Sequence, residues 1–218
     1  MNKRSRREPD LGNGSIGRLL FSLAVPAITA QLVNMLYNIV DRIYIGHIPE
    51  IGTAALTGVG ITFPIIILIM AFSSLIAMGG APRASIALGE KNPEKAERIL
   101  GNCFTALLLI SLVLTTVLFT FSEPILRAFG ASDNTIGYAN DYMRIYVCGT
   151  VFVQIALGMN MFITTQGFAA TAMVTTMLGG VLNIVLDPIF MFGLHMGVAG
   201  AALATVLSQM ASFVWVLM

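Results

Sequence analysis

Long apolar segments recur along this chain with only short polar interruptions, and this pattern constrains the fold more than any other feature. Each segment is near or above the roughly 20 residues that a helix needs to cross the hydrocarbon core of a membrane. Backbone groups in lipid must be satisfied internally, which favours helices. We therefore predict an all-α polytopic membrane protein in the lipid bilayer. Its six transmembrane helices lie at about residues 16–46, 53–78, 99–121, 136–163, 171–192 and 198–218.

The composition excludes several other classes of protein. Hydrophobic residues make up 56% of the 218 residues and charged residues 11%, whereas a soluble domain carries roughly a quarter charged residues. The net charge is only +1, with the charges grouped in loops, so nucleic-acid binding has no support. Cys103 and Cys148 fall in apolar segments and suggest no disulfide framework. His47 and His195 stand alone, so we expect no cofactor and no metal beyond a possible Na⁺.

Basic residues predict the orientation. They concentrate in the tail, residues 1–15, and in the loop at 80–98, which lie on the same side if the segments alternate. By the positive-inside rule the tail is cytoplasmic. Within this loop, Asn92-Pro93 is expected to start a short amphipathic helix. The chain stops at Met218 without a charged flank, which we interpret as the end of a fragment or of a truncated product.

The stretch from Asn183 to Gly193 places polar groups inside an apolar helix. Asp187 is costly there unless a cavity or a partner receives it. Asn183 lies one turn earlier on the same face, and Pro188 cannot donate to the carbonyl of Ile184. Oxygen atoms converging in apolar surroundings suit Na⁺, or a carboxyl group that exchanges a proton. The alternative is a kinked helix whose aspartate is satisfied by a neighbouring residue.

The first segment carries a second polar stripe. Pro26 predicts a kink, and Asn34, Tyr37, Asn38 and Asp41 follow at steps of three and four residues, so they share one face. The strings at 38–47 and 183–195 resemble each other, as do those at 52–57 and 200–205. Weak internal repetition of this kind is expected of transporters, which have sites at repeat interfaces.

Asp41 and Asp187 are the two carboxylates that we place deep within spans. If their helices pack together, the two acids share a cavity. They cannot then both stay ionised without a cation, so the pair should titrate as a coupled unit. Thr205 can add a hydroxyl, although such a residue alone more often bonds to its own helix. Tyr37 can offer an aromatic face to flat organic cations. Arg42 could instead neutralise Asp41 permanently.

Three strings of residues resemble the multidrug and toxic compound extrusion (MATE) family, in its bacterial multidrug branch. They are Asn38 to Ile43 with Ile45 to His47, the loop at 88–101, and above all Asn183 to Gly193. The resemblance implies two six-helix lobes around a cleft, driven by Na⁺ or H⁺. This chain matches only the amino-terminal lobe, so its partners would be the missing C-terminal lobe, or another second half, and the drug.

The resemblance also implies roles for particular residues. The cation or proton site would comprise Asp41, Asn183, Asp187 and Thr205, and Asn34, Tyr37 and Asn160 would lie near the drug. Pro26 would fall where the first helix can bend, and Pro188 would kink the fifth.

We therefore expect a cation-coupled antiporter that exports organic cations and drugs across the inner (plasma) membrane, and not an enzyme. One alternative is a flippase for lipid-linked oligosaccharide or polysaccharide, which would need a more cationic cavity; only Arg42 and Arg144 are candidates for it. An intramembrane aspartyl protease could use two embedded aspartates, but no Gly-x-Gly-Asp string is present. An inactive truncated half-transporter is a further alternative.

Overall fold

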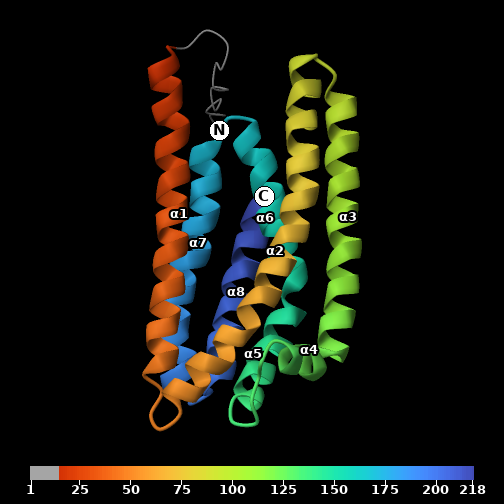
Figure 1. Cartoon of the computed structure of the whole chain (residues 1–218). Helices are drawn as coiled ribbons and strands as arrows, with labels where there is room; N and C mark the ends of the chain where they lie inside the picture. Colours follow the sequence, from red (N-terminus) through yellow and green to blue (C-terminus); the bar gives the residue numbers. More distant parts are fainter. Residues whose placement is uncertain (1–14) are drawn as a thin grey trace.

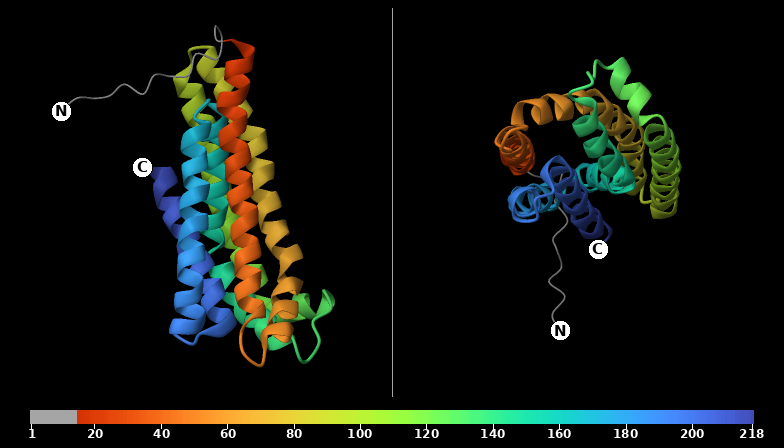
Figure 2. Two further views of the ribbon diagram at one scale, coloured as in Figure 1. Left: turned by 90° about the vertical axis from the view of Figure 1, so that its left-hand side faces the viewer. Right: turned by 90° about the horizontal axis from the view of Figure 1, so that it is seen from below.

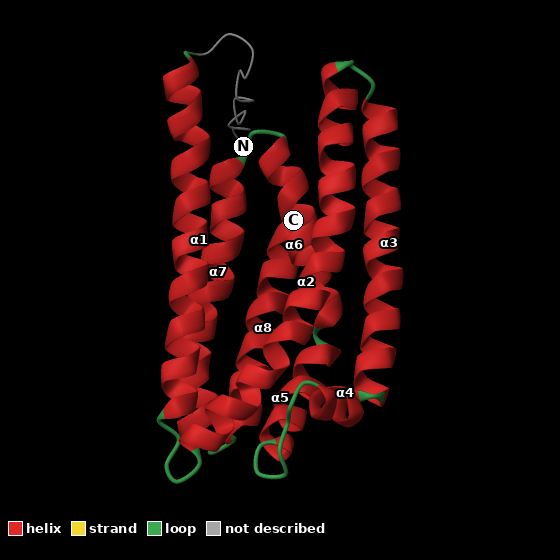
Figure 3. Ribbon diagram, viewed as in Figure 1, coloured by secondary structure: helices red, strands yellow, loops and turns green. Residues whose placement is uncertain are grey.

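Helices account for the secondary structure throughout the described part of the chain, residues 15–218 of a computed structural model (Figure 3). The predicted basic tail therefore lies almost entirely outside the described residues. The elements, in order, are α1 (Ile16–Gly46), α2 (Gly52–Gly89), α3 (Pro93–Thr120), α4 (Ser122–Ala128), α5 (Ile136–Cys148), α6 (Thr150–Thr165), α7 (Ala169–Pro188), the π-helical turn η1 (Ile189–Gly193) and α8 (Gly197–Leu217).

The lengths and compositions of these helices make the chain a multi-pass membrane protein. Within residues 15–218, five helical stretches are long and apolar enough to cross a membrane, and the bent pair α5 and α6 makes up to six. The chain bends by 57° where α5 passes into α6. The bend is at Gly149, where a Cβ atom would come within 2.6 Å of a methyl carbon of Val206. A side chain has no room there, so α8 approaches the bend closely.

The charged loop expected at 80–98 is mostly helical, which corrects the sequence interpretation. Helix α2 continues to Gly89 because its small residues keep packing inside the bundle, with Ala81, Ala84 and Ala87 all buried. Helix α3 then begins at Pro93, where the Asn92 side chain accepts a hydrogen bond of 3.0 Å from the Lys95 amide. The expected short amphipathic helix is therefore the first part of a long helix.

Three further elements differ from the expected segments. The fourth segment is broken into α5 and α6, and the loop after the third segment contains α4. Helix α7 ends at Pro188, and η1 follows it directly. This agrees with the inability of proline to continue the hydrogen-bond ladder of an α-helix. Helix α1, by contrast, continues through Pro26 as one helix from Ile16 to Gly46.

The helices pack as an upright bundle in which α1 lies beside α7 at one side and α3 lies at the other (Figures 1 and 2). Helix α1 packs mainly on α7 and much less on α2. One buried apolar core, which includes Ile45, Leu126 and Met191, lies toward the α1–α2 turn. A second, which includes Leu107, Ile155 and Phe162, joins α2, α3 and α6. Polar residues collect between α1 and the rest of the bundle.

Candidate functional site

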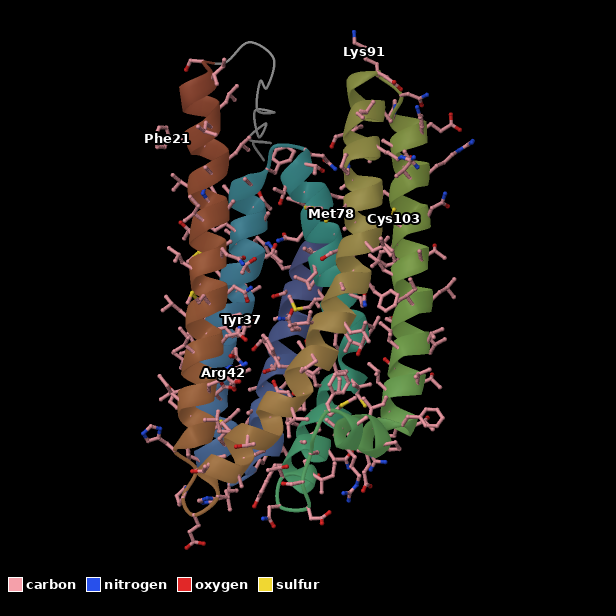
Figure 4. All side chains as sticks on the ribbon, in the orientation of Figure 1. Phe21, Tyr37, Arg42, Met78, Lys91 and Cys103 are labelled. Atoms are coloured by element: carbon pink, nitrogen blue, oxygen red, sulfur yellow. The ribbon has the colours of Figure 1, made fainter. Side chains whose placement is uncertain are left out.

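A cavity of about 690 Å³ lies among α1, α2 and α5 to α8. Its size is within the usual range for small-molecule sites. Figure 4 labels Tyr37 on the side of α1 that faces the bundle, whereas Phe21, on the same helix, points away from it. The polar residues that line the cavity are Gln31, Asn34, Tyr37, Asn38, Asp41, Arg42, Tyr142, Tyr146, Asn160, Thr175, Thr176, Thr205, Gln209 and Ser212.

The predicted cation-site residues come together at one wall of this cavity. Asp41 and Thr205 line it, and Asn183 and Asp187 lie behind them with exposed fractions of 2% and 0%. The Asn183 side-chain amide donates to Asp187 Oδ1 at 3.1 Å and approaches Thr205 Oγ1 at 3.3 Å. The turn spacing of Asn183 and Asp187 on α7 and the packing of α8 against α7 produce this arrangement.

Several oxygen atoms of this cluster have no hydrogen-bond partner. Among the buried side-chain atoms of the described residues, Asp41 Oδ1, Asn183 Oδ1 and Asp187 Oδ2 are unpartnered, and so are single atoms of Thr150, Gln154, Asn160 and Ser208. A buried polar atom without a partner is costly. Oxygen ligands of this kind, two of them from carboxylates, are what a small hard cation prefers. The cluster can therefore hold a cation, or a proton on one carboxyl group.

The two carboxylates of the cluster come from α1 and α7, which pack against each other. Helices α1 and α7 bring them together, and Gly180 permits this packing, because a Cβ atom there would come within 2.9 Å of Val33 Cγ1. Like charges in a medium of low dielectric constant repel strongly. A bound cation or proton would relieve this repulsion.

Arg42 does not form an ion pair with Asp41 in the described part of the chain, as the alternative interpretation would favour. Its guanidinium group lies 5.0 Å from the centroid of the Phe63 ring, and none of the ion pairs found within residues 15–218 joins it to Asp41. Arg144, the other candidate for binding diphosphate, lies over Phe119 and is not among the residues that line the cavity.

The structure also places the predicted drug-binding residues around this cavity. Asn34, Tyr37 and Asn160 all line it. The Asn160 amide donates to the carbonyl of Ala172 at 3.2 Å, while its Oδ1 remains unpartnered. Asn34 accepts, through its backbone carbonyl, a hydrogen bond of 2.7 Å from Asn38. The three residues offer amide and phenol groups next to apolar walls, a combination that suits a flat molecule with a few polar groups.

Sequence reasoning missed several residues of the cavity wall. Tyr142 and Tyr146 are buried on α5, with their rings stacked at 6.1 Å, and Gln209 and Ser212 come from α8. A signal was present, because two tyrosines four residues apart in an apolar segment lie on one helix face. The break at Gly149, which separates α5 from α6, could not be recognised from periodicity.

Comparison with known proteins gives consistent matches. The MatE family model matches residues 26–189. The multidrug export protein MepA of Staphylococcus haemolyticus is 29% identical over 195 residues, which are 89% of this chain and 43% of that protein. A crystal structure of a MATE P26A mutant superposes with a TM-score of 0.86 at 26% identity, over 94% of this chain and 45% of that one.

A solved transporter of the MOP superfamily from Pyrococcus furiosus is 28% identical, with a TM-score of 0.85. The match covers 93% of this chain and 44% of that one. This chain therefore spans less than half the length of the relatives that it matches.

Proposed function

The chain belongs to the MatE family, and on this premise we propose that it forms the amino-terminal lobe of a cation-coupled antiporter that exports organic cations and drugs. Family members are transporters and not enzymes. The observation that carries the proposal is the buried pair Asp41 and Asp187, which leaves unpartnered carboxylate oxygens next to a cavity of about 690 Å³. Relatives named as multidrug export proteins support the choice of drugs as substrates.

The proposed mechanism uses competition for the negative charge of this pair. With Na⁺ or H⁺ bound among Asp41, Asn183, Asp187 and Thr205, the repulsion between the acids is relieved and α1 packs closely on α7. When the ion leaves, the free charge attracts an organic cation into the cavity beside Asn34, Tyr37 and Asn160. A ligand shifts such an equilibrium only by its difference in affinity for the two states. Asp41 supplies that difference, because it lines the cavity and belongs to α1, which packs on the helix that carries Asp187.

The proposal includes a location and a partner. The protein lies in the inner (plasma) membrane with its N-terminus in the cytoplasm, as the basic residues of the sequence favour. The lobe pairs with a C-terminal lobe or with a second half. Support for this pairing comes from the relatives, of which this chain spans less than half the length.

Energised efflux of a fluorescent organic cation tests the proposal. Cells that express this chain are compared with cells that express Asp187→Asn, and the Na⁺ and pH gradients are collapsed separately. The matched control is Asp141→Asn, the same substitution at an exposed carboxylate on α5. We expect efflux in the wild type and in the control, loss of efflux in Asp187→Asn, and dependence on one gradient. Equal efflux in Asp187→Asn at equal expression would refute the mechanism.

The flippase remains the second candidate, because Arg42 does line the cavity and could contact a phosphate group. Absence of efflux from a well-expressed wild-type chain, with transfer of a lipid-linked saccharide in its place, would favour it. Absence of both activities would favour an inactive half-transporter.

A further inference from the structure

Two opposite charges lie next to each other on the exposed face of α5. Asp141 and Arg144 are three residues apart on this helix and both are exposed, so their side chains leave the same face. Opposite charges at this spacing commonly form an ion pair. None of the ion pairs found within residues 15–218 includes either residue, and neither residue lines the large cavity. Both charges are therefore available to a partner outside the protein.

The Arg144 side chain lies on an aromatic ring of α3 and not on Asp141. Its guanidinium carbon is 4.9 Å from the centroid of the Phe119 ring. An aromatic ring attracts a cation without cancelling its charge. The guanidinium group has five N–H donors in a planar fork, a geometry that matches the oxygen atoms of a phosphate group. Arg144 is therefore held in place with its charge still open to an anion.

Contacts between neighbouring elements fix the level of Arg144 in the bundle. Near the end of α3, the Thr115 hydroxyl donates to the carbonyl of Val147 at 3.1 Å. At the start of α4, the Ser122 hydroxyl donates to the side-chain oxygen of Asn140 at 2.7 Å. Helix α5 is therefore antiparallel to the last part of α3. Arg144 lies between these two contacts, beside the last turn of α3.

This level corresponds to an edge of the hydrocarbon core of the membrane. Helix α3 has no charged residue after Arg98. At about 1.5 Å per residue, the distance along α3 from Arg98 to Phe119 is about 32 Å, close to the roughly 30 Å thickness of the core. Leu112 and Val113, in the second half of α3, are 65% and 60% exposed, as expected of side chains that face lipid. Arg144 therefore lies at the depth of the phospholipid phosphates.

The order of the two charges matches a phosphoethanolamine headgroup. Helix α5 begins at the end of the bundle where α3 ends (Figure 1), so Asp141 lies about 4.5 Å farther toward the water than Arg144. In phosphatidylethanolamine the phosphate is attached to the glycerol, and the primary ammonium group lies beyond it. The guanidinium group can bind the phosphate, and the carboxylate can accept hydrogen bonds from the ammonium group.

We propose that Arg144 and Asp141 form a surface site for one phosphatidylethanolamine molecule, with the guanidinium group held on Phe119. The acyl chains of this lipid lie along the exposed apolar side of α3. Phosphatidylcholine fits less well, because its methylated nitrogen has no N–H group to donate. Phosphatidylglycerol places only negative charge beside Asp141. The inference goes beyond the proposed transport function and does not depend on it, because neither charge lines the cavity.

Lipid binding to the purified full chain tests the site. Native mass spectrometry counts bound lipid as the chain is titrated separately with phosphatidylethanolamine, phosphatidylcholine and phosphatidylglycerol that carry identical acyl chains. We expect the wild type to bind phosphatidylethanolamine roughly three- to tenfold more tightly than either of the others. The matched control is Arg127→Gln on α4. Glu123 and Asp133 already bind this arginine at 3.1 and 3.0 Å, so the substitution should change none of the three affinities.

Two variants separate the roles of the charges. Arg144→Gln removes the partner of the phosphate, so the affinities for phosphatidylethanolamine and phosphatidylglycerol should both fall by roughly threefold or more. Asp141→Asn removes the partner of the ammonium group and also a repulsive charge. Its affinity for phosphatidylethanolamine should fall by roughly threefold, while its affinity for phosphatidylglycerol should rise. A damaged fold would lower both affinities, so these opposite changes identify the site.

Three results would overturn the proposal. The first is an affinity for phosphatidylethanolamine that stays within twofold of the wild type in Arg144→Gln. The second is a change of both affinities in the same direction in Asp141→Asn. The third is a wild type that binds phosphatidylglycerol as tightly as phosphatidylethanolamine. Selective lipid binding by a chain that shows no efflux would reject the proposed transport function and support this site.

Discussion

Two buried polar clusters in this bundle differ in what their residues leave unsatisfied. In the cluster between α2 and α6, the Gln154 amide donates to the Ile69 carbonyl at 2.8 Å, and the Ser73 hydroxyl donates to the Gln154 carbonyl at 2.9 Å. This cluster is neutral, with one unpartnered amide oxygen. The cluster of Asp41, Asn183 and Asp187 leaves one oxygen unpartnered on each residue, and two of these are carboxylate oxygens.

The difference indicates that the two clusters have different roles. A neutral cluster whose donors reach backbone carbonyls joins two helices and can remain unchanged throughout a transport cycle. A cluster of acids with free oxygens is costly as it stands and becomes favourable only when a positive charge is bound. We therefore propose that Ser73 and Gln154 join two helices and that the ion-dependent change takes place at the acids. The following substitutions test this assignment.

Asp187→Asn should have the largest effect. The substitution preserves shape and removes the charge, so efflux should fall to background while the amount of folded protein stays near the wild-type level. Hydrogen bonds to charged groups contribute about 1.5–3 kcal/mol, which corresponds to roughly a tenfold to hundredfold loss of ion affinity. Efflux assays at matched expression measure the effect. Wild-type efflux in this variant would remove the distinction between the clusters.

Thr205→Val should have a smaller effect on the same cluster. The Thr205 hydroxyl lies 3.3 Å from the Asn183 amide and lines the cavity, and valine preserves the shape of the side chain. Losing one neutral hydrogen bond costs about 0.5–1.5 kcal/mol, so the ion concentration for half-maximal efflux should rise by up to roughly tenfold. Titration of the coupling ion measures this shift. An unchanged half-maximal concentration would exclude Thr205 from the site.

Gln154→Leu should act on stability and not on coupling. Leucine fills a similar volume but leaves the Ile69 carbonyl without this donor, at a cost of about 1 kcal/mol. Thermal unfolding of the purified protein should show a lower midpoint, while efflux per folded molecule should keep its ion dependence. A changed ion dependence with unchanged stability would show that the neutral cluster belongs to the transport mechanism.

Ser73→Ala should have the smallest effect. It removes one hydroxyl and its 2.9 Å bond to the Gln154 carbonyl, and a backbone carbonyl has a second lone pair for other partners. We expect a loss of about 0.5 kcal/mol, seen as a slightly lower unfolding midpoint, and full efflux. If this variant lost more stability than Gln154→Leu, the order of the two contacts in the neutral cluster would be wrong.

The fold class was predictable because long apolar segments in a membrane have few alternatives to helices. The matches to MatE relatives confirm the family resemblance seen in the strings around Asp41 and Asp187. Residues 80–98 were predicted to be a loop because they carry charged side chains, but they are mostly helical. Charged residues indicate where a helix leaves the membrane and do not indicate where the helix ends. The residues of α2 up to Gly89 continue the helix beyond the apolar part.

The site was predictable only in part. Helical spacing placed Asn183 with Asp187, and Asn34 with Tyr37, because residues three and four apart share a face. Spacing along one helix does not show which other helices approach it. Tyr142 lines the cavity from α5, the helix that ends just before the bend at Gly149, and Val206, a residue distant in sequence, approaches this bend closely. Tertiary contacts of this kind leave no periodic signal.

The most direct test of the ion-dependent cluster is the thermal stability of the purified chain as Na⁺ replaces choline at constant ionic strength, and separately as the pH is lowered. A ligand that binds only the folded state stabilises it. We predict that one of the two ions raises the unfolding midpoint of the wild type and of Ser73→Ala by about 3 °C or more, and has little effect on Asp187→Asn. If neither ion stabilised the wild type, or if Asp187→Asn responded equally, the carboxylate pair would not be the site of ion binding.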